Sequence, residues 1–280
     1  MAPFELSQPA SLREAIGLLD PDDPSVRPFS GGTALMLMMK AGVLRPSRLV
    51  SLAKAGLGGI EVSPKGELRA GAMTTLRELE RSEAVRRGWP VIARTLRTLS
   101  NVRVRNVATV GGHLSHADPH TDLPPLLAAL GASVTIAGPA GERNLPVDQL
   151  YAGYLESTLK RNELVTRLTI PPLGERRAAY LKCTTRSADD WPALGMAVVL
   201  EANDLRVFVS AATDRPTRLH AAEKILKGKT GDEKALKQAG EAAAEEVQIE
   251  SDLHGSAAYK KQLIRVYLAR AIHEARNASH

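Results

Sequence analysis

The stretch TVGGHLSHADPHTDLPP, residues 109–125, constrains the fold of this chain more than any other segment. It places two adjacent glycines, three histidines and two aspartates immediately before an apolar run. Glycine costs backbone entropy and polar groups resist burial, so core packing alone does not explain this composition. We therefore expect the stretch to bind a ligand. An earlier segment, Ser30-Gly31-Gly32-Thr33, repeats the paired glycines and predicts that the ligand is held at two places.

The overall composition narrows the class of protein. Lys and Arg number 37 against 31 Asp and Glu, but without a dense basic run, which favours a solvated surface or an acidic protein partner over nucleic acid. Aromatic residues make up only 4% of the chain, too few to favour base stacking with single-stranded nucleic acid. The one cysteine, Cys183, excludes an internal disulfide, a cysteine-ligated iron–sulfur cluster and a cysteine zinc site.

Neither export nor membrane insertion is expected. The N-terminus lacks the basic region and the apolar stretch of a signal peptide. No run approaches the roughly 18 apolar residues that a membrane span needs. We expect a cytoplasmic protein, and its 280 residues suffice for two or three subdomains.

The two glycine pairs are both predicted to form tight turns. A strand over residues 26–29 leads into Gly31-Gly32, and a helix that ends at Gly42 follows. Gly111-Gly112 is expected to repeat this turn. Asp122 is expected to cap the apolar helix behind it, because Asp commonly accepts from the first free N–H groups of a helix.

Capping boxes predict two further helix starts. Ser11 and Thr75 each precede a Glu by three residues, and the helix behind Thr75 is expected to run toward Val85. Most of the arginines that follow are interpreted as a solvated basic face: Arg94, Arg97, Arg103 and Arg105.

The C-terminal part has a different pattern. Strands are predicted over residues 178–183, 193–201 and 206–212. Helices are predicted over residues 219–226, 232–247 and 259–276. Strands followed by helices indicate an α+β fold, and Pro171-Pro172 with Gly174 marks the expected domain boundary.

Two chemical interpretations of the central stretch remain open on the residues alone. The first is a metal site built from His113, His116, Asp118, His120 and Asp122. Pro119 argues against the helix that would align two of the histidines, so free surface histidines, or one histidine beside an anion site, are the favoured interpretation.

The second interpretation is a cradle for a dinucleotide. Paired glycines let a backbone approach a pyrophosphate closely, and the hydroxyls of Thr33 and Thr109 can donate to its oxygens. Asp122 can accept from a sugar hydroxyl. Two phosphates and two sugars would explain two separate glycine segments.

Several motifs resemble the FAD-binding medium subunit of molybdenum hydroxylases, the xanthine dehydrogenase and carbon monoxide dehydrogenase flavoprotein family. The family's signature RNxATIGGNxxHADPxSDLPP is similar to residues 105–125. Its first flavin segment is similar to residues 29–33, and its GAxTT segment to residues 71–75. Further matches, such as Tyr180-Leu181-Lys182 and Asp252, extend the resemblance over nearly the whole chain.

The resemblance implies an α+β architecture: a two-part FAD-binding domain of the vanillyl-alcohol-oxidase type, then a small C-terminal α+β domain. The implied bounds are residues 1–174, in two lobes of about 1–55 and 56–174, and residues 175–280. No metal ligand is implied. The FAD-binding residues that the resemblance implies are Pro28, Phe29, Ser30, Gly31, Gly32, Thr33, Ala34, Leu35, Leu99, Thr109, Val110, Gly111, Gly112, His113, Ser115, Asp118, Asp122, Val165 and Lys182.

Two of these positions depart from the family pattern. His113 stands where the family usually has Asn, and Ala34 where an acidic or polar residue is common. Trp191 is interpreted as a core tryptophan, with packing near the flavin as the alternative hypothesis.

The resemblance implies an electron-transfer role rather than catalysis on the organic substrate. The partners would be a large molybdopterin-binding subunit and a small subunit with [2Fe–2S] clusters, assembled as a dimer of heterotrimers. The alternatives are a stand-alone FAD-dependent oxidase and a non-catalytic nucleotide-binding regulatory protein.

Overall fold

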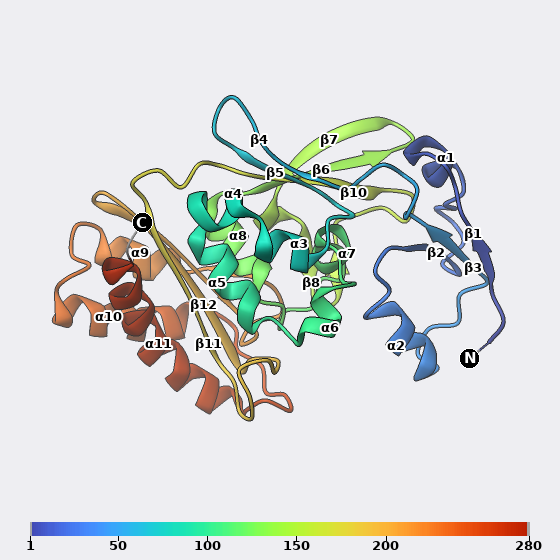
Figure 1. Cartoon of the computed structure of the whole chain (residues 1–280). Coiled ribbons are helices and arrows are strands. Elements are labelled where there is room, and N and C mark those ends of the chain that lie inside the picture. The colour runs from blue at the N-terminus through green and yellow to red at the C-terminus, as the bar shows by residue number, and fades with distance from the viewer. Residues whose placement is uncertain (1, 279–280) are drawn as a thin grey trace.

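The computed structural model describes residues 2–278, and Figure 1 shows three bodies in a row with the two termini at opposite ends. The N-terminal lobe is built around a three-stranded parallel sheet of order β1-β3-β2. Its elements are β1 (Glu5–Ser7), α1 (Leu12–Gly17), β2 (Val26–Phe29), α2 (Leu35–Lys40) and β3 (Arg48–Ser51). Ser11 caps α1 as predicted, because its hydroxyl accepts from the backbone N–H of Glu14.

The central lobe carries a five-stranded sheet of order β4-β5-β10-β6-β7, antiparallel throughout. Its strands are β4 (Ile60–Val62), β5 (Leu68–Gly71), β6 (Ser133–Gly138), β7 (Gly141–Pro146) and β10 (Leu164–Ile170). Its smaller elements are η1 (Val147–Gln149), β8 (Tyr151–Gly153) and β9 (Glu156–Ser157). Leu164 of β10 also packs in the small core of the N-terminal lobe, which joins the two lobes.

Six helices follow one another beneath this sheet (Figure 1). They are α3 (Leu76–Arg81), α4 (Glu83–Gly88), α5 (Pro90–Thr98), α6 (Val102–Arg105), α7 (Val110–Ser115) and α8 (Leu123–Leu130). The capping box at Thr75 is confirmed, but the helix behind it stops at Ser82, which has extended ψ and caps a separate α4. Every residue of α8 is buried, and Gly131 ends it in the left-handed conformation.

The C-terminal domain is a four-stranded antiparallel sheet with three helices. Its elements are β11 (Arg177–Cys183), β12 (Leu194–Glu201), β13 (Asp204–Ser210), β14 (Thr217–Arg218), α9 (His220–Leu226), α10 (Glu233–Glu246) and α11 (Ala257–Asn277). The predicted α+β class is confirmed, and so are the strands and helices expected in this part.

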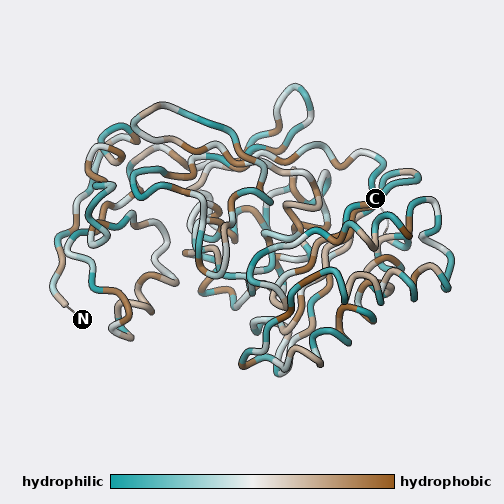
Figure 2. The backbone as a smooth tube through the Cα atoms, turned by 180° about the vertical axis from the view of Figure 1, so that it is seen from behind, coloured by the Kyte–Doolittle hydropathy of each residue, from teal (hydrophilic) through white to brown (hydrophobic). Residues whose placement is uncertain are grey.

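The sheet of this domain is buried on both faces. Successive side chains of a strand point to opposite faces, so Met196 and Val198 of β12 pack with α10 and α11. Ala197 and Val199 face the other way and join the core of the central lobe, where α8 lies. Figure 2, seen from behind, shows hydrophobic stretches running through both the central lobe and the C-terminal domain.

One arginine of the predicted basic face is buried instead. Arg94, Arg97 and Arg103 are exposed, but Arg105 is 7% exposed and its Nε donates to Glu80 Oε2 at 3.0 Å. A buried ion pair needs further hydrogen bonds to offset desolvation. The Arg105 guanidinium finds them in the carbonyls of Leu99 and Ser100. None of the helices within residues 2–278 is long and apolar enough to cross a membrane.

Candidate functional site

A cavity of about 530 Å³ opens between the N-terminal lobe, the central lobe and the segment before β12. This volume lies within the range of about 300–1,000 Å³ that small-molecule and cofactor sites occupy. Its walls come from the loop between β2 and α2, the start of α7, the loop from α7 to α8, and residues 189–191. Segments that lie far apart in the sequence thus converge on one site.

The first glycine pair forms the predicted turn. Gly32 has a φ of 68°, a conformation that side chains disfavour, and the ring of Phe29 packs against it. Within residues 2–278, no group accepts from the backbone N–H groups of residues 31–35, while Met36 already donates to Gly32. Five successive amide donors beside a cavity favour an anionic ligand.

The second glycine pair does not form a turn, contrary to the prediction. Gly111 and Gly112 lie in the first turn of α7, which Thr109 caps by accepting from Gly112 N at 3.2 Å. Val110 N donates to Thr74 O at 2.9 Å, and Gly111 N to Ala72 O at 2.8 Å. These amides are satisfied inside the protein, so this segment lines the cavity without offering them to a ligand.

The two glycine segments pack against each other. A Cβ added at Gly31 would lie 2.1 Å from the carbonyl oxygen of Val107, just before the second segment. A Cβ added at Gly112 would lie 2.6 Å from Ser30 Oγ, in the first segment. The Gly31 contact is with backbone, which cannot rotate away, whereas the Gly112 contact is with a side chain; together the segments form one wall of the cavity.

Asp122 does not cap α8, contrary to the prediction. Its carboxylate is 4% exposed and accepts from Tyr180 Oη at 2.7 Å and from Lys182 Nζ at 3.1 Å. Burial raises the pKa of Asp122, and the Lys182 ammonium opposes that rise. Lys182 also donates to Thr98 O at 2.7 Å. Lys182 of the C-terminal domain thus connects Asp122, which lines the cavity, with the end of α5.

The histidines are not free surface groups, which corrects that interpretation. Burial lowers the pKa of His113 to about 4, so this imidazole is neutral at physiological pH. Its Nε2 is buried and has no hydrogen-bond partner in residues 2–278. His116, whose pKa is also lowered by burial, lines the cavity beside it. In the described part of the chain, no three His, Cys, Asp or Glu side chains are grouped so as to hold a metal.

Most of the expected site residues meet at this cavity. Those that line it are Pro28, Ser30, Gly31, Gly32, Thr33, Ala34, Leu35, Leu99, Thr109, Gly111, Gly112, His113, Ser115, Asp122 and Val165. Four lie behind the lining: the Phe29 ring packs at Gly32, Val110 is fully buried, Asp118 binds His120, and Lys182 supports Asp122.

Other lining residues lie outside the predicted FAD-binding set, although His116 and His120 are among the candidate metal ligands and Trp191 near the flavin is the alternative hypothesis. The backbone of Ala72 and Met73 belongs to the GAxTT-like segment, a signal that was available in the sequence. His116, His120 and Trp191 also line the cavity. Trp191 is 46% exposed, so the interpretation as a core tryptophan is wrong.

Comparison with known proteins matches both parts of the chain. Residues 2–173 match the family described as the FAD binding domain in molybdopterin dehydrogenase, and residues 179–275 match the CO dehydrogenase flavoprotein C-terminal domain. The chain is 28% identical to the glyceraldehyde dehydrogenase medium chain of Sulfolobus acidocaldarius, over 97% of this chain and 98% of that one.

Two further comparisons agree. The carbon monoxide dehydrogenase medium chain of Afipia carboxidovorans is 30% identical, over 98% of this chain and 96% of that one. The solved structure of reconstituted CO dehydrogenase from Oligotropha carboxidovorans superposes with a TM-score of 0.93, at 29% identity over 99% of both chains.

The fold and the cavity define an oxidoreductase subunit with a two-domain FAD-binding fold. More narrowly, the chain belongs to the FAD-binding medium subunits of the molybdenum hydroxylase family, and its cofactor is FAD. The resemblance stated from the sequence is thereby confirmed.

The residues of the cavity fit this cofactor. The unpaired amides of residues 31–35 suit a pyrophosphate, and the glycines let the two segments that line the cavity approach each other closely. The apolar side chains of Leu99 and Val165 suit a flat aromatic ring system.

Proposed function

We propose that this chain is the electron-transfer subunit of a three-subunit molybdenum hydroxylase. It takes electrons from [2Fe–2S] clusters of a small partner and passes them to an external acceptor, while a large molybdopterin-binding partner transforms the organic substrate. The single cysteine supports this division, because a [2Fe–2S] cluster needs four protein ligands, usually cysteines, so the clusters belong on another chain.

The observation that carries the proposal is the wall formed by the two glycine segments. Bound there, FAD supplies a centre that exchanges one or two electrons. The amides of residues 31–35 hold the pyrophosphate, and Thr109, which also lines the cavity, can donate its hydroxyl hydrogen to a phosphate oxygen. His113, neutral because of burial, adds no charge near the flavin.

The division of labour along the chain follows. We assign residues 1–174 to the FAD-binding domain and residues 175–280 to the C-terminal domain, which closes the cavity through Trp191. The names of the relatives as medium chains support a larger assembly, for which we propose a dimer of heterotrimers in the cytoplasm.

The test is co-expression with the adjacent genes, followed by purification through a tag on this chain. We expect a yellow complex that contains a molybdopterin subunit and an iron–sulfur subunit, in which substrate added to the complex bleaches the flavin absorbance. A monomeric yellow chain that oxidises a substrate unaided would instead establish a stand-alone oxidase. A chain that stays colourless with added FAD would leave the regulatory alternative.

A further inference from the structure

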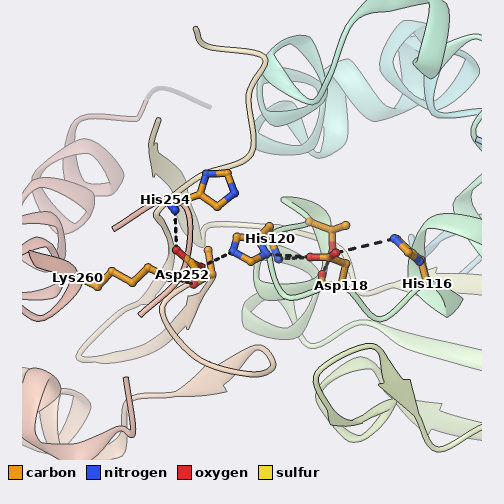
Figure 3. Close-up of polar contacts among 8 residues, drawn as sticks. His116, Asp118, His120, Asp252, His254 and Lys260 are labelled. Carbon is orange, nitrogen blue, oxygen red and sulfur yellow. Dashed lines mark hydrogen bonds and ion pairs between the residues drawn. The ribbon is translucent and has the colours of Figure 1, made fainter. Parts of the chain in front are cut away.

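His120 occupies an unusual position in the loop between α7 and α8. Its imidazole is 8% exposed, and both ring nitrogens face carboxylates (Figure 3). Nδ1 lies 3.0 Å from Asp118 Oδ1, and Nε2 lies 2.9 Å from Asp252 Oδ2. The sequence separates His120 and Asp252 by 132 residues, so this contact joins two distant segments.

The hydrogen-bond geometry assigns the charge of the ring. A carboxylate only accepts, so each ring nitrogen must carry a proton, and His120 is an imidazolium. Burial by itself lowers the pKa of His120, but the hydrogen bonds and charges of Asp118 and Asp252 outweigh it and raise the pKa. Although burial also acts on Asp252, its bonds from Lys260 and His120 lower its pKa to about 2.

A second buried cation completes the cluster. Lys260 is 1% exposed, and its Nζ donates to Asp252 Oδ2 and, at 2.8 Å, to the carbonyl of Ala211. Two carboxylates thus face two cations, and the cluster has no net charge. If His120 lost its proton, one buried carboxylate would remain without a compensating charge, which is costly in a low-dielectric site.

The cluster connects the two domains. Asp118 and His120 belong to the central lobe, whereas Asp252 and Lys260 come from the end of the C-terminal domain (Figure 3). A backbone hydrogen bond from Ala211 N to Pro119 O, 2.9 Å long, crosses the same boundary.

The ring of His120 also supports Trp191. The two rings stack with centroids 5.5 Å apart and planes inclined by 27°. A cation against an aromatic face is an attractive pairing. Both His120 and Trp191 line the cavity, and the Trp191 side chain is half exposed.

We propose that His120 is a positioning residue, whose imidazolium ties Asp118 to Asp252 across the domain boundary and holds the indole of Trp191 against the cavity. That the cavity holds FAD rests on the function proposed above, but the positioning of Trp191 does not. Through Trp191, His120 helps to retain the bound cofactor and to exclude water from it.

The positioning weakens at high pH. The contribution of His120 is complete below pH 6.5, the ordinary pKa of histidine, and is lost as the pH rises through the raised folded pKa. Burial lowers the pKa of both His116 and His254, so their titration falls at lower pH. The titratable and charged groups around His120 are Asp118, Asp252 and Lys260 of the cluster itself, together with His116, Tyr154 and His254.

The test measures quenching of Trp191 by acrylamide in the full-length chain without FAD. The chain has a second tryptophan, the buried Trp89. Subtracting the signal of Trp191→Phe from that of the wild type cancels the Trp89 fluorescence and leaves that of Trp191. We expect the quenching constant to rise about twofold above the folded pKa, because the side chain is 46% exposed when held. His120→Gln should show the raised constant at every pH.

His273→Gln is the matched control, because His273 is a half-exposed histidine whose Nε2 lies 3.4 Å from Glu233. It should behave as wild type. If His120→Gln fails to fold, Asp252→Asn and the pH titration of the wild type still decide. A quenching constant that is flat with pH in the wild type overturns the inference, as does an NMR spectrum in which one ring nitrogen of His120 is unprotonated at neutral pH.

A second measurement separates this inference from the proposed function. In the FAD-loaded chain, His120→Gln should release FAD about tenfold faster, because the indole of Trp191 is no longer held against the cavity. If Trp191 responds to pH but the chain binds no FAD, the proposed function fails and the positioning stands. If FAD binds but Trp191 does not respond, the positioning fails.

Discussion

The two Gly-Gly pairs have the same sequence but different backbone conformations. At Gly31-Gly32 the chain turns with a positive φ and leaves five amides without a partner among residues 2–278, whereas at Gly111-Gly112 it is helical and the first amides of the helix are all paired. What the pairs share is proximity: Gly31 faces Val107 and Gly112 faces Ser30. Paired glycines in a sequence therefore indicate close packing more dependably than they indicate a turn.

The largest effect is expected for Gly31→Ala. Its Cβ would lie 2.1 Å from a backbone oxygen, which cannot rotate away, so the two segments would have to separate. We expect a loss of about 3 kcal/mol, the upper end for overpacking, measured by urea unfolding. Gly17→Ala is the control, since within residues 2–278 a Cβ added there has no atom within 4 Å apart from its chain neighbours and its own helix backbone. Equal stability of the two variants would show that the segments do not interlock.

A smaller loss is expected for Gly32→Ala, which tests the turn itself. The positive φ of 68° costs an alanine about 1–2 kcal/mol, and the Phe29 ring must also move. Gly42→Ala isolates the conformational part, because Gly42 has a φ of 73° and open space around it. Thermal melting of both variants gives the contribution of Phe29 by difference.

The cap of the second segment contributes about as much as an ordinary N-cap. Thr109→Ala removes the acceptor of Gly112 N and should cost about 1 kcal/mol. Thr109→Ser keeps the hydroxyl and should retain most of that stability. If alanine were as well tolerated as serine in urea unfolding, α7 would not depend on this cap.

Gly112→Ala should be milder still, and this contrast with Gly32→Ala is the sharpest test of the comparison. Its backbone is helical, where alanine is favoured over glycine by about 1 kcal/mol. That gain offsets the contact with Ser30 Oγ, a side chain that can rotate. We expect little change in unfolding free energy but weaker FAD binding by fluorescence titration, because the cavity wall moves.

The smallest effect at neutral pH is expected for His113→Asn, which restores the usual family residue. A histidine whose folded pKa of about 4 lies below its ordinary 6.5 destabilises the fold as the pH falls through that interval. The variant should match wild type at pH 7 and be more stable near pH 5, measured by urea unfolding. A clear loss of FAD affinity at pH 7 would mean that the cofactor forms a hydrogen bond with the buried Nε2 of His113.

Much of the fold follows from local signals in the sequence. The caps at Ser11 and Thr75, the turn at Gly31-Gly32 and the helix end at Gly131 are set by residues a few positions apart. Such signals act through short-range sterics and hydrogen bonds, so they can be recognised without the tertiary structure.

The errors come from contacts between distant residues. Asp122 is a residue type that commonly caps helices. Its carboxylate instead accepts hydrogen bonds from Tyr180 and Lys182, which lie about sixty positions later in the chain. The sequence favours a free surface histidine at His120, because its partner Asp252 lies 132 residues away in another domain. The family resemblance supplied the cofactor and most of the cavity lining, but it did not include His120 or Trp191.

The double burial of β12 has a consequence for how the molecule unfolds. Ala197 and Val199 share a core with α8, while Met196 and Val198 share one with α10 and α11. Cutting the chain after Gly174 would expose an apolar surface on each fragment. The two domains should therefore melt in a single cooperative transition. For the same reason, fragments expressed separately should aggregate unless both are present together.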